Sequence, residues 1–231
     1  MVHAHNIEQQ DLYDMYNNGI RMVRFCINPK NIDSIFDYIK IAKKIGFIVC
    51  VNVTRISSLQ SSQILNYAKI FNTSGADVFY LADSNGSTRP VRIGGLFTQL
   101  YALDLNMELG FHAHNNMFLA LTNAVIAVEA KATYIDSSLA GMGKGAGNLG
   151  IFDWLAYLNS KTSLSNYDLS TMIPLLEQCI RDCNMCNPEH EILDTIFGIY
   201  DLSIEMKSDP FFKKKKLPQE TLNYAQNLSV A

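Results

Sequence analysis

Residues 109–149 read LGFHAHNNMFLALTNAVIAVEAKATYIDSSLAGMGKGAGNL, and this stretch decides which fold and which site we expect. Residues 109–111 predict the end of a buried strand, and His112 and His114 follow at a spacing of two. Side chains two positions apart in an extended backbone point to the same side. The two imidazoles can therefore converge on one point, which is the geometry of a chelating pair.

The rest of the stretch brings more polar groups to the same region. A pair of asparagines after the histidines can cap a helix over residues 117–128, and the next strand, 133–139, carries Asp136 near its end. Residues 140–148 contain four glycines, which let a loop pass close to a ligand and turn its N–H groups toward an anion. The alternative is that the histidines lie in a surface loop and the glycines only make a tight connection. The combination of features favours a ligand site.

Strands and helices alternate along the chain as far as about residue 160. Each predicted strand is followed by a helix, and a repeat of about 25 residues indicates parallel βαβ units joined by right-handed crossovers. We expect strands at 1–3, 21–27, 47–54, 77–84, 109–111 and 133–139, and helices at 8–17, 32–45, 57–72, 91–103, 117–128 and 151–158, then at 169–184 and 188–206, where Asp209-Pro210 ends the helical run.

Two architectures produce this alternation, an open doubly wound sheet and a (β/α)8 barrel. No G-x-G-x-x-G motif follows the first strand, and polar residues gather where several strands end. In a barrel those ends face one mouth, where the active site lies, so the sequence favours the barrel. The polar positions are Asn28, Asn52, Thr54, Asp83, Ser84, His112, His114 and Asp136.

The predicted barrel is shorter than a complete one. A (β/α)8 barrel has eight strands and about 250 residues, whereas the repeat here supplies about six strands. We therefore expect a TIM-barrel catalytic domain that is truncated at its N-terminus over residues 1–160, C-terminal helices over 161–210 and a basic tail over 211–231.

The composition limits the classes of protein to which the chain can belong. The chain has 231 residues, 48% hydrophobic content, a net charge of −3 and a pI near 5.9. It can bury one sizeable core, and its charge gives no general attraction to nucleic acid or to an anionic membrane. No segment approaches the ~20 apolar residues of a membrane span, and the N-terminus has no signal-peptide core, so we expect a cytoplasmic protein. The basic run Lys213 to Lys216 is expected to be a solvated tail, with a patch for an acidic partner as the alternative.

Five cysteines are an odd count in a chain without a secretion signal, so we expect reduced thiols. Cys179, Cys183 and Cys186 have the C-x3-C-x2-C spacing by which radical-SAM enzymes hold an iron–sulfur cluster. Here the motif lies late in a predicted helix, where these positions share one face. Helix packing is therefore favoured over a cluster.

The motifs GFHAHNN (110–116) and IDSSLAGMGKGAGN (135–148) resemble those of the metal-dependent pyruvate aldolases and HMG-CoA-lyase-like enzymes, the DRE-type TIM-barrel metallolyases. Within that family the 4-hydroxy-2-oxovalerate aldolases are the most similar, from near residue 15 to about residue 205, including MVRFCIN, YLADSNG and GIYDLS. The resemblance implies that His112 and His114 bind a divalent metal, Mn2+ or Mg2+. It also implies that Ser84 and the glycine-rich loop, including Asn148, lie beside the substrate.

The chain departs from the family pattern at its start. The family opens with a strand that ends in a T-L-R-D-G-type motif, whose Asp is the third protein ligand and whose Arg polarises the substrate carbonyl. The only Arg-Asp pair here is Arg181-Asp182, in a late helix. We therefore expect the chain to begin at the third strand of the family, as a natural truncation, a mis-assigned start or a fragment. We also expect it to bind metal poorly and to have little or no aldolase activity. His3 and His5 form a second H-x-H that could supply a substitute ligand, although a loop role is favoured.

One further role comes from the resemblance. In the related aldolases a helical C-terminal domain sends a tyrosine into the active site as a proton donor, and GIYDLS places Tyr200 at that position. The alternative is that Tyr200 only packs in an amphipathic helix.

These residues are suited to retro-aldol chemistry. A divalent metal that keeps open coordination positions can bind a 2-oxo acid and act as a Lewis acid. We expect cleavage of a 4-hydroxy-2-oxo acid to pyruvate and an aldehyde. An acyl-CoA-condensing synthase or an HMG-CoA-lyase-like enzyme is the first alternative, and a non-catalytic remnant or a barrel half completed by a partner chain is the second. The expected partners are the 2-oxo acid and either further copies of the chain or an enzyme that takes up the aldehyde.

Overall fold

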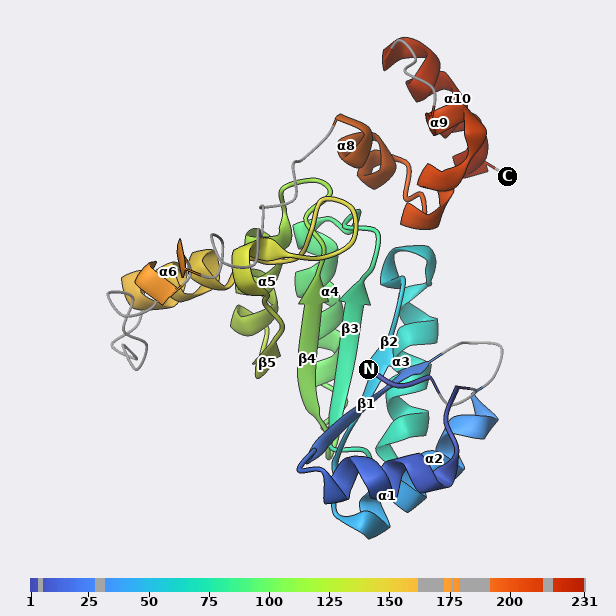
Figure 1. Cartoon of the computed structure of the whole chain (residues 1–231), viewed down its shortest axis with the longest axis vertical. Coiled ribbons are helices and arrows are strands. Elements are labelled where there is room, and N and C mark those ends of the chain that lie inside the picture. Colours follow the sequence, from blue (N-terminus) through green and yellow to red (C-terminus); the bar gives the residue numbers. More distant parts are fainter. Residues whose placement is uncertain are drawn as a thin grey trace. The chain divides into compact units, whose positions relative to one another are not determined.

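The strands of the sheet lie side by side in the order in which they occur in the sequence (Figure 1). In this computed structural model the pairs β1–β2, β2–β3 and β4–β5 are parallel. A doubly wound sheet would reverse its strand order partway, so the order expected of a barrel is confirmed, although the barrel is not closed over the described residues. The strands are β1 (Met22–Ile27), β2 (Ile48–Val53), β3 (Val78–Asp83), β4 (Glu108–Ala113) and β5 (Tyr134–Ile135).

The chain divides into two units. The first comprises Met1–Ala82, Val91–Phe111 and Ile126–Ile135, and the second comprises Asp83–Pro90, His112–Val125 and the described part of Asp136–Ala231. The predicted domain boundaries at residues 160 and 210 stay predictions. The structure describes residues 1–3, 6–27, 32–161, 173–175, 177–178, 192–213 and 218–230.

A strand stub precedes β1 in the first unit. Val2 forms a parallel bridge with Phe25. Its N–H donates to the carbonyl of Arg24 at 2.8 Å, and its carbonyl accepts the N–H of Cys26 at 3.0 Å. The stub predicted for residues 1–3 is therefore confirmed.

The helices of the repeat follow the strands as predicted. α2 illustrates why they end where they do, because Gly46 after its last turn has a φ of 110°, a left-handed conformation that glycine adopts without strain. No helix in the described part of the chain is long and apolar enough to cross a membrane. The helices are α1 (Gln9–Asn17), α2 (Asp33–Ile45), α3 (Ser61–Asn72), α4 (Pro90–Tyr101) and α5 (Ala120–Glu129), with a 3-10 turn η2 (Ile56–Ser58) before α3.

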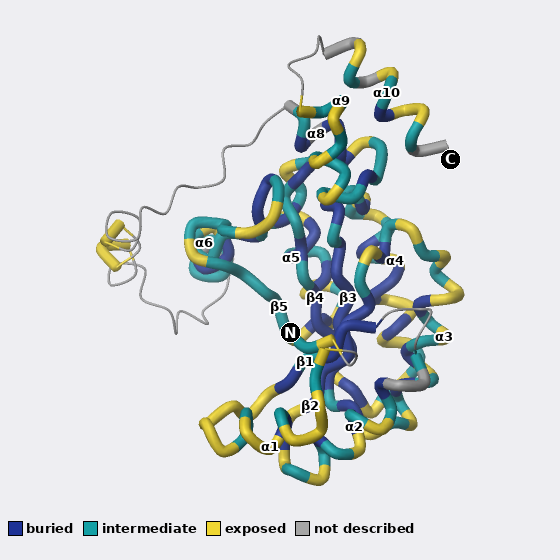
Figure 2. Tube along the Cα trace, turned by 45° about the vertical axis from the view of Figure 1, so that its right-hand side comes forward, coloured by how far each residue is buried: buried dark blue, intermediate teal, exposed yellow. Residues whose placement is uncertain are grey.

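The two faces of the sheet in the first unit differ in chemistry. On the face toward the helices, buried apolar side chains alternate along the strands, and Phe111 of β4 packs edge-on against Phe97 of α4, with ring centroids 5.8 Å apart. Figure 2 shows the strands largely buried and the outer faces of the helices exposed. On the other face the Arg24 guanidinium lies 3.6 Å from the ring centroid of Tyr80, which is 2% exposed. A β-carbon on Gly110 would come within 2.6 Å of that ring, so this face has no room for a side chain there.

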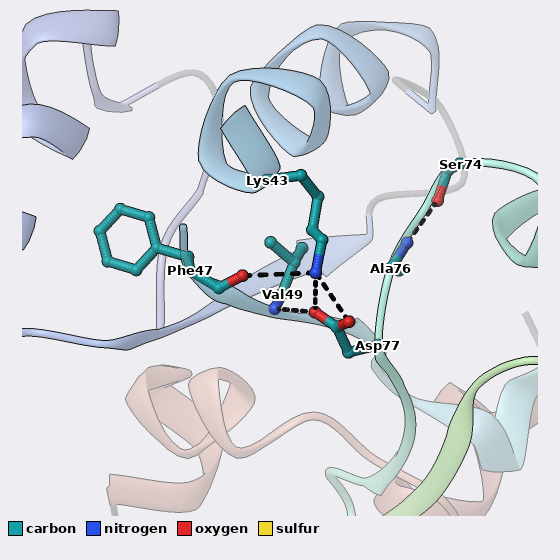
Figure 3. A network of polar contacts seen from close by, with 6 residues as sticks. All are labelled: Lys43, Phe47, Val49, Ser74, Ala76 and Asp77. Carbon is teal, nitrogen blue, oxygen red and sulfur yellow. Dashed lines mark hydrogen bonds and ion pairs between the residues drawn. The ribbon is translucent and has the colours of Figure 1, made fainter. Parts of the chain in front are cut away.

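An ion pair fastens the N-terminal ends of β2 and β3 (Figure 3). The Lys43 ammonium of α2 lies 2.7 and 2.6 Å from the two carboxylate oxygens of Asp77. The same carboxylate accepts the N–H of Val49 at 2.7 Å. Because both charged side chains are more than a third exposed, the pair stabilises the fold only modestly.

The second unit contains the segments that directly follow β3, β4 and β5, together with the helices after residue 150. A buried cluster joins its last helices and consists of Ile196, Phe197, Leu202 and Ala225, with Leu193, Tyr200, Met206, Phe212 and Leu228 packed against it. The elements after β5 are η3 (Leu139–Gly141), α6 (Ile151–Lys161), α8 (Ile192–Ile199), η4 (Ile204–Ser208), α9 (Pro210–Lys213) and α10 (Pro218–Val230).

Three predicted elements are wrong in length or type. The helix predicted to reach residue 206 ends at Ile199, because Asp201 takes a left-handed conformation with a φ of 54°. Pro210 begins α9 instead of ending the helical run, since proline is well tolerated in the first turn of a helix. The strand predicted over 133–139 is only Tyr134–Ile135, because the backbone N–H of Ser138 leaves the sheet and donates to the carbonyl of Leu149 at 3.0 Å.

Candidate functional site

His112 and His114 bring their rings together at the end of β4. The ring centroids are 5.2 Å apart and the ring planes are inclined by 73°. His114 also forms an antiparallel bridge with Asn148, so the end of the glycine-rich loop runs beside it. The two rings are therefore close neighbours, as the two-residue spacing predicts. Their role as metal ligands stays a prediction.

The His112 ring is held by a carboxylate. Its Nδ1 lies 3.0 Å from Oδ2 of Asp136, and the two side chains are 19% and 24% exposed. The parallel register of β4 and β5 pairs Phe111 with Ile135, so the next residue on each strand is brought opposite the other. A ring that donates its Nδ1 proton to the carboxylate keeps Nε2 unprotonated, and this is the nitrogen that can then bind a metal.

The His114 ring is partly buried and is held by the glycine-rich loop. The pKa of His114 is lowered from 6.5 to about 4, mainly by burial and in addition by the neighbouring His112. Hydrogen bonds with the backbone of Lys144 and Gly147 oppose this shift. At neutral pH His114 is therefore a neutral imidazole, the form in which histidine binds metals.

The glycine-rich loop is locked against its neighbours. At the end of the loop, the Gly147 carbonyl accepts the N–H of Asn115 at 3.0 Å. The backbone of Gly147 is left-handed, with a φ of 84°. A β-carbon on Gly145, whose φ is 60°, would come within 2.9 Å of the Ile204 side chain. Both positions favour glycine because their backbones are left-handed, and Gly145 does so also because of the close approach of Ile204.

Asn148 supplies an oxygen that has no hydrogen-bond partner among the described residues. Its amide nitrogen donates to the carbonyl of Met142 at 2.9 Å, while its buried Oδ1 is left over. Buried oxygens are normally satisfied, so an unpaired one on a residue whose backbone bridges to His114 is available to a bound ligand or ion. No group of three or more His, Cys, Asp or Glu side chains in the described ranges is arranged to hold a metal.

The loop after β3 is organised by Asp83, which is fully buried. Its carboxylate accepts the backbone N–H groups of Ser87 at 3.3 Å and Thr88 at 3.0 Å. Burial raises the pKa of the Asp83 carboxyl, and these two residues oppose the rise. Ser84 follows Asp83 directly, so its position is set by this turn.

Sequence reasoning missed the contacts between these loops and the residues around α8. The Asp201 carboxylate accepts hydrogen bonds from Ser87 and Asn85, which are more than a hundred residues away in the sequence. The carbonyl of Asp194 accepts from the Asn116 amide at 3.4 Å. A side chain with several potential partners gives no sequence signal that selects one of them.

A model of the HMGL-like family matches residues 23–178. The chain belongs to the HMGL-like family. The matched segment runs from β1 to beyond α6, so it contains both histidines, Asp136 and the whole glycine-rich loop.

The curated relatives of this HMGL-like chain are named as 4-hydroxy-2-oxovalerate aldolases. The relative from Bacillus thuringiensis (strain Al Hakam) is 31% identical over 170 residues, which cover 74% of this chain and 50% of the relative. The relative from Carboxydothermus hydrogenoformans is 33% identical over 145 residues, which cover 63% of this chain and 41% of the relative. The chain spans about half the length of the curated relatives it matches.

Solved structures confirm the predicted α/β fold of the TIM-barrel type. The N-terminal domain of a protein described as an aldolase from Bacteroides vulgatus has a TM-score of 0.79 and 25% identity, and the match covers 97% of this chain and 74% of that one. An HMG-CoA lyase from Acinetobacter baumannii, in complex with coenzyme A and 3-methylmalate, has a TM-score of 0.67 and 17% identity, over 78% of this chain and 68% of that one.

The remaining site prediction for this HMGL-like chain concerns Tyr200. The residue lies just after α8 and packs against the cluster formed by Ile196, Phe197, Leu202 and Ala225, as the packing alternative expects. Its role as a proton donor stays a prediction. The predictions for Asn28, His5, Cys179, Cys183, Cys186 and the Arg181-Asp182 pair lie outside the described residues.

Proposed function

We propose that this HMGL-like chain carries the metal-binding part of a divalent-metal-dependent aldolase, a carbon–carbon lyase that cleaves a 4-hydroxy-2-oxo acid to pyruvate and an aldehyde. The proposal rests mainly on the His112 and His114 rings, whose centroids lie 5.2 Å apart. Asp136 contacts the first ring, and the backbone of the glycine-rich loop contacts the second. The names of the curated relatives support the choice of reaction.

The residues around the histidines fit a divalent ion. His112 and His114 offer nitrogens, and the unpaired Oδ1 of Asn148 offers an oxygen. Mixed nitrogen and oxygen ligands with room for water suit Mn2+ or Mg2+, for which we propose the site. When bound, the ion supplies Lewis-acid stabilisation of the negative charge that develops on the keto oxygen of the substrate.

The other residues of the site bind the substrate and move protons. Ser84 and Asn148 orient the 2-oxo acid, Ser84 from the turn after β3 and Asn148 from the end of the glycine-rich loop. As the bond between carbons 3 and 4 breaks, the proton of the 4-hydroxyl passes to water and the bonding electrons form the enolate of pyruvate. Tyr200 then delivers a proton to carbon 3 of this enolate and is reprotonated by water. The fixed turns around Asp83 and Gly147 keep these groups in place, which lowers the entropic cost of positioning the substrate.

A second function in the same family is less well supported. An acyl-CoA-condensing synthase or an HMG-CoA-lyase-like enzyme would share the histidines and the glycine-rich loop. The HMG-CoA lyase structure, however, is 17% identical and shows the fold alone, whereas the aldolase relatives are above 30%. The aldolase therefore stands first.

The setting of the reaction is part of the proposal. We place the protein in the cytoplasm, because Cys26 and Cys50 are buried free thiols, as in a reducing compartment. The substrate is a small 2-oxo acid, and the aldehyde passes to a partner enzyme or is released from an oligomer of this chain.

Two measurements test the proposal. Mn2+ binding is followed by electron paramagnetic resonance, and pyruvate release from 4-hydroxy-2-oxovalerate is followed with lactate dehydrogenase. His112→Ala and His114→Ala should each lower Mn2+ affinity at least about tenfold and remove metal-dependent pyruvate release, since each removes a ligand. His3→Ala is the control and should change neither. Unchanged Mn2+ binding in the double His112/His114 variant would overturn the metal assignment, and equal pyruvate release in EDTA would overturn the metal dependence.

A further inference from the structure

The turn that carries Ser84 is fastened from two sides. From within, the carbonyl of Asp83 accepts the N–H of Gly86 at 3.0 Å, and its carboxylate accepts two further backbone N–H groups. From outside, the turn packs closely on the loop that follows His114, because a β-carbon on Gly86 would come within 2.7 Å of the backbone nitrogen of Asn116. The turn therefore has little freedom as long as its side chains are also bound.

Those side chains are bound by Asp201, the second residue beyond the end of α8. Its carboxylate accepts from Ser87 Oγ at 2.6 Å and from Asn85 Nδ2 at 2.8 Å, and its carbonyl lies 3.2 Å from the same Asn85 nitrogen. Asn85 is 7% exposed, so its bonds are shielded from water. Hydrogen bonds to a charged group are about twice as strong as neutral ones, and two of them converge on this one carboxylate.

The backbone conformation of Asp201 indicates that its side chain has a role. Its φ of 54° is left-handed, and helices that end this way usually have glycine at that place. Aspartate adopts this conformation more readily than most residues. Its β-carbon still makes the conformation sterically less favourable than it is for glycine. The bonds to Asn85 and Ser87 offset that cost.

We propose that Asp201 is a positioning residue that holds the Ser84–Ser87 turn in the conformation that binds the substrate. The inference rests on the proposed function insofar as Ser84 contacts a 2-oxo acid. It also links two parts of the candidate site, because Asp201 follows Tyr200 directly in the sequence. The hydrogen bonds of Asp201 thus join the end of α8 to the turn after β3.

The decisive variant is Asp201→Gly, because it removes the carboxylate and also removes the backbone strain. If the side chain had no role, this change would leave the protein unchanged or stabilise it. The matched control is Asp104→Gly. Asp104 is also an aspartate shortly after a helix, α4, with a φ of 49°, and it is exposed. Asp201→Asn is the conservative variant, since asparagine accepts the left-handed conformation and keeps one acceptor oxygen.

Hydrogen exchange of the amides of Gly86, Ser87 and Thr88 is measured on the whole chain, with the amides of β3 as an internal reference. Asp201→Gly should speed exchange of these three amides at least about tenfold, because two charge-assisted bonds are lost. Asp201→Asn should show an intermediate rate, and Asp104→Gly should leave the turn unchanged. Equal exchange in Asp201→Gly and the unaltered chain would overturn the proposal.

A second readout separates this inference from the proposed function. Binding of pyruvate in the presence of Mn2+ is measured by calorimetry, and Asp201→Gly should weaken it at least about threefold while Mn2+ binding alone is unchanged. If the unaltered chain binds no pyruvate, the assignment of Ser84 to a 2-oxo acid fails, and with it the substrate role of Asp201. Faster exchange in Asp201→Gly would then still show that the carboxylate holds the turn. A loss of Mn2+ affinity equal to the loss of pyruvate affinity would contradict a local effect on the turn.

Discussion

The Nδ1 atom of His112 lies 3.0 Å from Oδ2 of Asp136, the residue that follows β5. A carboxylate in this position fixes both the orientation of the ring and the nitrogen that carries the proton. In the proposed metal site, the nitrogen left to bind an ion is therefore set before the ion arrives, which would reduce the reorganisation that binding requires.

Asp136→Asn should lower the affinity of the chain for Mn2+ by about 10–100-fold, because the amide is a poorer acceptor and no longer makes the Nε2 lone pair more basic. Mn2+ titration followed by electron paramagnetic resonance measures the affinity. Nitrogen-15 NMR of the metal-free protein should show His112 with its proton on Nδ1 in the unaltered chain and a mixture of tautomers in the variant. Ser137→Ala, at the next position, is the control. A purely Nε2-protonated His112 in the unaltered chain would contradict this account.

The stability of the metal-free protein should fall as the pH is lowered from 6.5 to 4, and His114 should be one cause. Its pKa in the folded state is about 4, below the value of 6.5 that it takes in the unfolded chain. The unfolded chain therefore binds more protons over this interval. The contribution of His114 to the free energy of unfolding is fully present above pH 6.5 and is lost as the pH falls through 4. The shift corresponds to ~3 kcal/mol at most. Urea unfolding in EDTA at several pH values should show a weaker pH dependence for His114→Gln than for the unaltered chain, and identical slopes would refute the assignment.

Gly110→Ala should destabilise the first unit by about 1–3 kcal/mol, because the new methyl group would overlap the Tyr80 ring. The ring is buried and stacked under Arg24, so it cannot move away freely. Gly95→Ala in α4 is the matched control, since its β-carbon would meet nothing closer than 4.0 Å. That change should stabilise the protein by about 0.5–1 kcal/mol through helix propensity. Urea unfolding measures both, and the prediction fails if the two variants shift the midpoint in the same direction.

The chain should bind Mn2+ at least about tenfold more weakly than the full-length Bacillus thuringiensis relative. The donors proposed among the described residues are two imidazoles and an amide oxygen, whereas Mn2+ and Mg2+ favour sites that include a carboxylate. The two proteins are compared in one titration under the same buffer and salt. Equal affinities would mean that a carboxylate such as Asp136 joins the ligands directly.

The order of the strands could be predicted from the sequence because it rests on repeated local signals. Each strand is a short run of buried residues, each following helix has a clear end such as Gly46, and crossovers between parallel strands have one hand. The convergence of His112 and His114 needed only the two-residue period of an extended backbone. Of the asparagine pair expected to cap the next helix, Asn115 accepts the N–H of Ala120, the first residue of α5, whereas the Asn116 amide donates to the carbonyl of Asp194.

The contacts that fix the site could not be predicted in this way. The bond between Asp201 and Asn85 joins residues far apart in the sequence, and neither residue belongs to a motif that names the other. The end of α8 was misplaced because a helix pattern continues through Tyr200 while the backbone at Asp201 turns left-handed. α10 was missed because the lysines before it suggested a solvated tail, whereas its packing on α8 depends on the buried Ala225.

The segment from Asp194 to Glu205 touches three separate loops, at Asn116, at the turn of Asn85 and Ser87, and at the glycine-rich loop through Lys144 and Gly145. During synthesis the last strand of the sheet, β5, leaves the ribosome some sixty residues before this segment, about 3–12 seconds at ordinary rates of elongation. The sheet can thus fold before the loops that carry His114 and Ser84 have made their contacts with the segment from Asp194 to Glu205. In a nascent chain arrested near residue 190 the sheet would then be folded, but the loops of the candidate site would not yet be ordered. They would become ordered only after the segment from Asp194 to Glu205 had emerged.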